Sequence, residues 1–252
     1  MTMIRSLMIA TLLAGVCHAQ RPLTLTVTLP RDADGNIAAD GEVRVPVVHE
    51  VMSGANLVGS DGASIPAIVH PETDHWLLRW KGLDDAQRSS ATVAMIHFED
   101  DGDGVLSMKP AVVQPSADHT LRLRACDATI TGRLLRYEPQ PHKHTVGYWA
   151  DAKDTAAWTF ETPTAGTYNV AVLQGCGTGD GGSTVTATLS GDSQGSMDFE
   201  VVETGHFQNF RWFDVGTVEL QPGQTTLTLS AKRLVNNAIG DFREVQLTLV
   251  RP

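Results

Sequence analysis

The sequence lacks any run of basic residues. Its 252 residues carry 19 Lys and Arg against 29 Asp and Glu, which gives a formal net charge of −10. Proteins that bind nucleic acid need clustered Lys and Arg to neutralise the phosphates. Nucleic acid is therefore not an expected partner, and neither are anionic surfaces in general.

Helical patterns are nearly absent, and the only strongly apolar segment is too short to span a membrane. One short amphipathic stretch, Gly82 to Ser90, predicts a brief helix. The basic start MTMIR, the apolar SLMIATLLAGV and the small residues that follow indicate a signal peptide over residues 1–19, cleaved after Ala19. We therefore expect a secreted or periplasmic protein. Lipid attachment at Cys17 is less favoured, because Val16 is a poor residue just before a lipidated cysteine.

Cysteine is scarce as well. After removal of the signal peptide only Cys126 and Cys176 remain. The oxidising compartment outside the cytoplasm permits a disulfide between them. Two separate buried thiols are the alternative, and spacing does not decide between the two.

Short runs of alternating apolar and polar residues fill most of the chain, separated by Gly, Pro, Asp and Asn. Alternation with a period of two predicts strands with one buried face. Many short strands with turn signals between them predict an all-β sandwich or barrel. The clearest runs are LTLTVTL (23–29), VRVPVV (43–48), ATVAMIHF (91–98), GTYNVAVL (166–173), STVTATL (183–189), TTLTLSA (225–231) and EVQLTLV (244–250).

A domain boundary is predicted in the segment KPAVVQPSADH (109–119), which contains two prolines and little pattern. This predicts a small β-sandwich domain over residues 21–108, a linker over 109–120 and a jelly-roll domain over 121–252.

Three motifs that suggest chemistry lack the context that the chemistry needs. GDSQG (191–195) matches the G-x-S-x-G of hydrolases, but a strand rather than a helix follows it. HKH (142–144) offers two imidazoles without the further ligands that zinc requires. LQGCGTGDGGS (173–183) has no lysine and stands between strands, which excludes a P-loop. We interpret the three as a hairpin, a solvated loop and a strand-to-strand connection.

The second half also shows blocks in a fixed order, over about Asp127 to Val250. They are LRYEPQPHKHTVGYWADAKDTAAWTF, PTAGTYNVAVLQGCGTGDGGS, ETGHFQNF, DVGTVELQPGQTTLTL and GDFREVQLTLV. This series resembles the accessory β-sandwich at the C-terminus of many secreted bacterial sulfatases and fucosidases. That module is similar to carbohydrate-binding modules of the family-6 type, and the resemblance implies a jelly roll of two antiparallel sheets.

The resemblance further implies a structural calcium ion, with Asp127 and Asp241 at the matching positions. The chain departs from the family pattern, because the usual first-strand Glu pair is absent and Gly240 and Phe242 flank Asp241. Most relatives carry only the cysteine of the GCG block, so the resemblance does not imply a disulfide between Cys126 and Cys176.

A sugar-binding site needs an aromatic platform and a few polar groups on a rigid support. Trp158 lies within a predicted strand, where we expect it in the core. The candidate ligand-binding residues are Tyr148, Trp149, His206, Asn209, Trp212 and Asn237.

No catalytic domain accompanies these residues. The C/S-x-P-x-R signature of sulfatases is absent, and the (β/α)8 barrel of fucosidases would need many helices. We therefore expect a non-catalytic carbohydrate-binding or accessory protein that acts on extracellular polysaccharide, alone or docked on a partner enzyme. Two alternatives stay open. A small glycan hydrolase or lyase would use facing carboxylates such as Glu203 and Asp241, and a protein-contact module would show a flat apolar patch.

Overall fold

The computed structural model describes residues 23–100 and 104–251, and their regular secondary structure consists almost entirely of strands. The expected all-β architecture of antiparallel sheets is confirmed. The predicted signal peptide over residues 1–19, with Cys17, lies outside the described residues. Among the residues that are described, no helix has the length and apolar composition needed to cross a membrane.

The first half of the chain forms two antiparallel sheets. One sheet has the order β1 (Leu23–Thr28), β7 (Ala91–Phe98), β3 (Met52–Gly59) and β4 (Ser64–Pro66). The other has the order β2 (Gly41–Val45), β6 (Trp76–Trp80) and β5 (Ile68–Pro71). The expected short helix is α1 (Asp85–Ser90), which begins with a capping box between Asp84 and Gln87.

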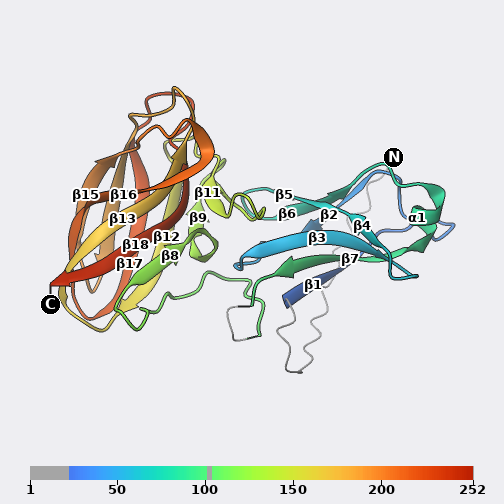
Figure 1. Ribbon diagram of the computed structural model, residues 1–252, viewed down its shortest axis with the longest axis horizontal. Helices are drawn as coiled ribbons and strands as arrows, with labels where there is room; N and C mark the ends of the chain where they lie inside the picture. Colours follow the sequence, from blue (N-terminus) through green and yellow to red (C-terminus); the bar gives the residue numbers. More distant parts are fainter. Residues whose placement is uncertain (1–22, 101–103, 252) are drawn as a thin grey trace.

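The second half forms a larger sandwich (Figure 1). Its six-stranded sheet contains β10 (Arg136–Glu138), β11 (Thr145–Gly147), β18 (Asp241–Arg251), β13 (Gly166–Cys176) and β16 (His206–Leu220), with β8 (Leu121–Arg124) paired to β18. Its five-stranded sheet has the order β15 (Gly195–Glu200), β14 (Thr184–Gly191), β17 (Gly223–Arg233), β12 (Thr155–Thr162) and β9 (Thr129–Thr131). A 3₁₀ helix, η1 (Ala125–Asp127), follows β8.

Alternation along the strands builds the core between these two sheets. Val170 and Val172 of β13 are buried, and so are Leu227 and Leu229 of β17 in the opposite sheet. Burying an aliphatic side chain of this size stabilises a fold by about 1.5–3 kcal/mol. The residues between the buried ones point outward, so those of β13 lie on the outer face of the six-stranded sheet.

The two halves are joined by packed rings and hydrogen bonds. Trp76 of β6 lies 6.3 Å from Phe98 and 6.1 Å from Tyr137 of β10, measured between ring centroids. The Tyr137 hydroxyl donates to the carbonyl of Glu50 at 3.0 Å. The amide of Gln140 donates to the carbonyl of Val69 at 3.0 Å.

The segment expected to be a linker is partly fixed to the sandwich. The backbone N–H of Val113 donates to Thr159 at 2.9 Å, and the N–H of Glu161 donates to Val113 at 3.0 Å. Val113 is buried and forms a parallel bridge with Phe160 of β12. The division into domains at residues 109–120 stays a prediction. Around Val113, however, this segment is hydrogen-bonded to β12 of the sandwich.

Cys126 and Cys176 are free thiols, which corrects the disulfide candidate. Cys126 lies in η1 with Glu50 among its charged neighbours, whereas Cys176 ends β13 near Asp241. Burial raises the pKa of the Cys176 thiol to about 11 and raises that of Cys126 further. Both thiols therefore stay protonated and are poor nucleophiles.

Candidate functional site

One row of side chains crosses the outer face of the six-stranded sheet. Leu173 of β13 pairs with Trp212 of β16 on one side and with Glu244 of β18 on the other. Glu244 in turn pairs with Arg124 of β8. Directly paired residues point to the same face of a sheet, and neighbouring strands are about 4.8 Å apart. The row therefore spans about 14 Å from Trp212 to Arg124.

Trp212 is the exposed aromatic residue of this row, with 45% of its surface accessible. A second row lies beside it, where Asp214, Ala171 and Gln246 are paired across the same three strands. Asn169 donates from its amide to the Asp214 carboxylate at 2.8 Å. The face thus combines one large ring with short side chains and hydrogen-bonding groups.

Arg122 and Glu244 form a two-point ion pair on this face. Arg122 Nε donates to Glu244 Oε1 at 2.7 Å, and Arg122 Nη2 donates to Glu244 Oε2 at 3.0 Å. Contact with the carboxylate raises the pKa of Arg122 above its usual value. The glutamate is buried while the arginine is exposed, so the guanidinium is the part of the pair that meets solvent.

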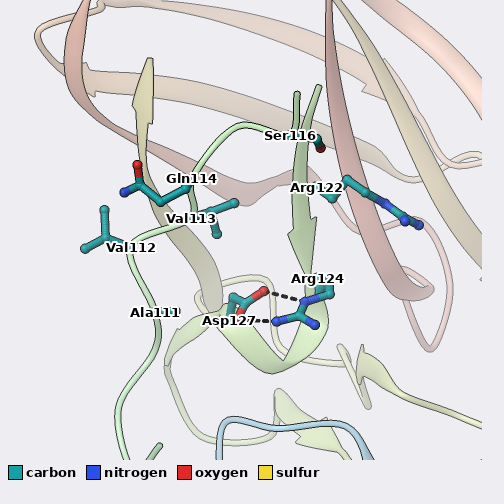
Figure 2. A pocket seen from close by; sticks show the side chains of 8 residues that line it. All are labelled: Ala111, Val112, Val113, Gln114, Ser116, Arg122, Arg124 and Asp127. Atoms are coloured by element: carbon teal, nitrogen blue, oxygen red, sulfur yellow. Dashed lines mark hydrogen bonds and ion pairs between the residues drawn. The ribbon is translucent and has the colours of Figure 1, made fainter. Parts of the chain in front are cut away.

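A cleft of about 360 Å³ adjoins the Arg124 end of the row. Figure 2 shows its two sides, with residues 111–116 opposite β8, and Arg124 reaching across to Asp127. Arg124 donates to Asp127 from Nε at 3.0 Å and from Nη2 at 3.4 Å. The indole of Trp158 donates to the Arg124 carbonyl at 2.7 Å, which fixes the backbone here. A second cleft, lined by Pro115, Glu161 and Gln224 among others, lies on the far side of Gln114.

Tyr148, one of the predicted platforms, lies on a loop rather than on the sheet face. It is 53% exposed, its φ is +61°, and the guanidinium of Arg136 lies 4.1 Å from the centre of its ring. One face of the ring is therefore already covered. A backbone bond from Ile239 to Trp149 joins this loop to the loop that carries Asn237.

Trp149 is not a platform, which corrects the prediction. It is 0% exposed and packs edge-on against Phe242, with 5.7 Å between ring centroids. The sequence could not show this, because adjacent residues of a loop can point to opposite sides. In this loop Tyr148 turns out and Trp149 turns into the core.

The other predicted ligand-binding residues are dispersed. His206 starts β16, and its Nδ1 accepts from the backbone of Gln208 at 3.1 Å. The amide of Asn209 donates to the carbonyl of Thr204 at 2.5 Å, which is a structural role. Asn237 is exposed between β17 and β18. The structure does not bring these three onto the Trp212 face as one constellation.

Two buried carboxyl groups meet beside Gly147. A Cβ on Gly147 would lie 2.8 Å from Asp241 Oδ1 and 2.9 Å from Glu138 Oε2, so any larger residue there would have to displace these carboxyl groups. Lys143 Nζ donates to Glu138 Oε1 at 3.0 Å, and Arg136 Nε lies 3.8 Å from the same oxygen. Burial and the charge of Glu138 raise the pKa of Asp241 to about 7.

These residues fit a calcium ion poorly. Asp127 is bound by Arg124 rather than turned toward Asp241. Glu138, which does lie near Asp241, is already bound by Lys143. Within residues 23–100 and 104–251 no group of three or more His, Cys, Asp or Glu is placed to hold a metal ion.

Sequence reasoning missed Arg122, Glu244, Glu138 and Lys143. The sequence did contain a signal for Arg122, because LRLR (121–124) places two arginines on one face of an alternating strand. Glu138 and Lys143 carry no such signal. Their meeting with Asp241 depends on pairing between strands far apart in the sequence.

The chain matches no protein-family model and no curated protein sequence. Among solved structures it is similar to a family 35 carbohydrate binding module from Clostridium thermocellum, at 15% identity over 51% of this chain and 96% of that one, with a TM-score of 0.42. The C-terminal CBM6 of LamC, a marine laminarinase from Zobellia galactanivorans, is 18% identical over 51% of this chain and 98% of its own, with a TM-score of 0.43. An alpha-L-fucosidase from Vibrio sp. strain EJY3 is 12% identical over 92% of this chain and 39% of its own, with a TM-score of 0.33.

Carbohydrate-binding modules, the type named in the sequence resemblance, thus occur among the similar structures. At these TM-scores the similarities carry no argument about function. The function is argued from the residues of this chain.

Proposed function

We propose that this protein binds a glycan, without chemical conversion, on the outer face of its six-stranded sheet. The observation that carries the proposal is the position of Trp212, an exposed ring in one row with Leu173 of β13 and Glu244 of β18 and beside Asp214 of its own strand. The C–H face of a sugar packs on an aromatic ring, and its hydroxyls need fixed donors and acceptors close by.

The flanking strands supply those groups on a rigid support. Asp214 lies on one side of Ala171, where it accepts from Asn169 of the same strand as Ala171. Gln246 and the exposed guanidinium of Arg122 lie on the other side. Strands hold side chains with little freedom, so less conformational entropy is lost when a flexible glycan binds.

The positions of the carboxylates give less support to a catalytic function. The cleft beside Arg124 is lined by one carboxylate, Asp127, and the second cleft by one, Glu161. Glycoside hydrolysis needs a pair of carboxyl groups facing the scissile bond. Of the carboxylates named for an enzyme, Asp241 is buried, and Glu203 accepts a hydrogen bond from the backbone of Gly179 at 2.8 Å.

A protein-contact module is also less well supported. Such a surface would present a contiguous apolar patch. The ring of Trp212 is instead bordered by Asp214 and by Leu173, which is half-buried, and beyond Leu173 by Glu244. We further propose that the glycan is extracellular, on the strength of the signal peptide predicted in the sequence. A partner enzyme is expected to dock on a surface other than this sheet face.

The test is affinity electrophoresis of the mature protein through gels that contain individual polysaccharides. Trp212→Ala is expected to lower the affinity about tenfold, since loss of an aromatic platform costs about 1.4 kcal/mol. Val235→Ala is the matched control, because Val235 is equally exposed but lies on the loop after β17. Tyr148→Ala tests the loop in parallel and should have the smaller effect.

Retardation by no polysaccharide would overturn the proposal. So would binding that survives Trp212→Ala but is lost in Tyr148→Ala, which would move the site to the loops.

A further inference from the structure

We infer that Arg243 forms a second contact for the glycan beside Trp212, and that the group it binds is an anionic substituent of the glycan, a carboxylate or a sulfate. This inference rests on the proposed function, because Arg243 lies on the same outer face of the six-stranded sheet. It adds a ligand class and the residue that selects it.

A bulge in β18 directs Arg243 toward this face. Glu244 pairs with Leu173 and Phe242 pairs with Gln174, so Arg243 between them is an extra residue with no partner in β13. With regular alternation Arg243 would point to the face opposite Glu244, into the core. An extra residue in an antiparallel strand re-aims a side chain, and such bulges are common next to functional sites.

The guanidinium lies over an aromatic ring near the proposed platform. Cζ of Arg243 is 3.9 Å from the centre of the Phe210 ring. Phe210 and Trp212 are two residues apart in β16, so their side chains leave that strand on one face. At about 3.3 Å per residue, their Cα atoms are about 7 Å apart. A glycan that lies on Trp212 can therefore reach Arg243 as well.

Two backbone carbonyls hold the guanidinium in place. Nε of Arg243 donates to the carbonyl of Lys143 at 2.8 Å, and Nη2 donates to the carbonyl of His142 at 2.9 Å. Arginine has five N–H donors in a planar fork, so both N–H groups of Nη1 and one of Nη2 stay outside these bonds. Carboxylate and sulfate oxygens match the geometry of that fork.

Arg243 differs from Arg122 and Arg124 because it has no carboxylate as a partner. Within residues 23–100 and 104–251, its hydrogen bonds and its ring contact go to neutral groups. Burial lowers the pKa of Arg243, but an arginine stays charged at neutral pH. A partly buried charge without a partner is costly. An anionic group of the ligand supplies the missing partner.

Two carboxylates of this sheet face do not neutralise the bulged arginine. Glu244 is bound at two points by Arg122. Asp214 lies beyond Trp212, four residues from Phe210, which is about 13 Å along β16. Charges are screened beyond about 8 Å at physiological ionic strength, so the net charge of −10 does not oppose an anionic ligand here. Composition suggested no anionic partner because it averages over the whole surface.

The experiment compares the wild type with Arg243→Gln and with Arg243→Lys, which keeps the charge. Affinity electrophoresis measures binding to a polyuronate and to a sulfated polysaccharide, each beside its carboxyl-reduced or desulfated counterpart. The readout is the ratio of the affinities for the charged and the neutral member of a pair. The wild type should prefer the charged member about tenfold. Arg243→Gln should lose that preference, and Arg243→Lys should keep most of it.

The ratio separates a binding role from a structural one. A variant that merely loosens the loop around residues 142 and 143 weakens binding of both members of a pair and leaves their ratio unchanged. Preference for the polyuronate over its reduced form assigns a carboxylate as the bound group. Preference for the sulfated chain over its desulfated form assigns a sulfate.

His142→Asp and His142→Asn provide a second measurement that leaves Arg243 intact. His142 is exposed, and its carbonyl holds the guanidinium. The two replacements are almost equal in size and differ by one charge. His142→Asp should bind the charged glycan about threefold more weakly than His142→Asn, and added salt should reduce the difference. The neutral glycan should bind equally to both. If Arg243→Gln fails to fold, this pair decides.

Equal binding of charged and neutral glycans by the wild type overturns the inference. So does an unchanged ratio in Arg243→Gln, or equal binding of the charged glycan by the two His142 variants. If Trp212→Ala still weakens binding in those cases, the proposed function stands without the anionic contact. If the ratio depends on Arg243 but binding does not depend on Trp212, the anionic contact stands and the proposed platform is wrong.

Discussion

Trp212 and Glu244 point from the same face of the six-stranded sheet, two strands apart, because each is paired with Leu173 between them. The strand spacing sets their separation at about 10 Å. The ring and the ion pair of Glu244 with Arg122 are thus held at a fixed distance by the sheet itself, with no flexible loop between them.

The Arg122–Glu244 pair should respond asymmetrically to substitution. Arg122→Ala leaves a buried carboxylate without its partner, so the free energy of unfolding should fall by about 1–3 kcal/mol. Glu244→Gln leaves an exposed guanidinium that water can solvate, so its cost should be smaller, about 1 kcal/mol. Urea denaturation of both variants measures the difference. A larger loss for Glu244→Gln would contradict the assignment of the glutamate as the buried member.

The cation beside Glu138 and Asp241 should be a lysine rather than a metal ion. Lys143→Met removes the ammonium from Glu138, a buried carboxylate, and should lower the free energy of unfolding by about 1–3 kcal/mol. Lys143→Arg keeps the charge and is the control. Thermal unfolding of the three proteins measures the effect.

The same melting experiment, repeated with EDTA and with added calcium, tests the structural calcium implied by the sequence. The wild-type Tm should not change with either addition, because the ammonium of Lys143 already compensates the charge of Glu138. A fall in Tm with EDTA, reversed by calcium, would show that a metal ion does bind and that the lysine moves.

His144 should make stability depend on pH below neutrality. Burial, with the nearby charge of Arg243, lowers the pKa of His144 from its ordinary value of 6.5 to about 4 in the folded protein. As pH falls, His144 is therefore protonated first in the unfolded chain. Its contribution to the stability of the folded protein is complete above pH 6.5 and is lost between 6.5 and about 4.

The reference for this effect is His144→Asn, since asparagine tolerates the φ of +43° at this position. Relative to that variant, the wild type should lose about 1–2 kcal/mol of stability from pH 7 to pH 4, a figure reduced for solvent screening because the ring is only half-buried. Denaturation curves at several pH values give the difference. Parallel pH profiles for the two proteins would contradict the assignment.

Local patterns predicted much of the fold. The run Ala91–Phe98 is strand β7 with the bounds that its alternation indicates, and the short helix falls within Gly82 to Ser90. Strand ends were less predictable. The run 43–48 was expected to be one strand, but β2 ends at Val45, just before Pro46. The run 166–173 was expected to end at Leu173, but β13 continues through Cys176. The candidate site was predicted only in part, since Trp212 lies on the sheet face while Trp149 is buried.

The sequence by itself determined the period-two alternation, and with it the all-β class. Successive residues of a strand point to opposite faces, so which residues face inward depends only on their local order. Only the tertiary structure decided which residues meet. Arg124, Glu244, Leu173 and Trp212 come from four strands, and their row exists because hydrogen-bonded pairing fixes one register among many. The same non-local pairing separates Cys126 from Cys176, places Lys143 against Glu138, and turns part of an expected linker into the wall of a cleft.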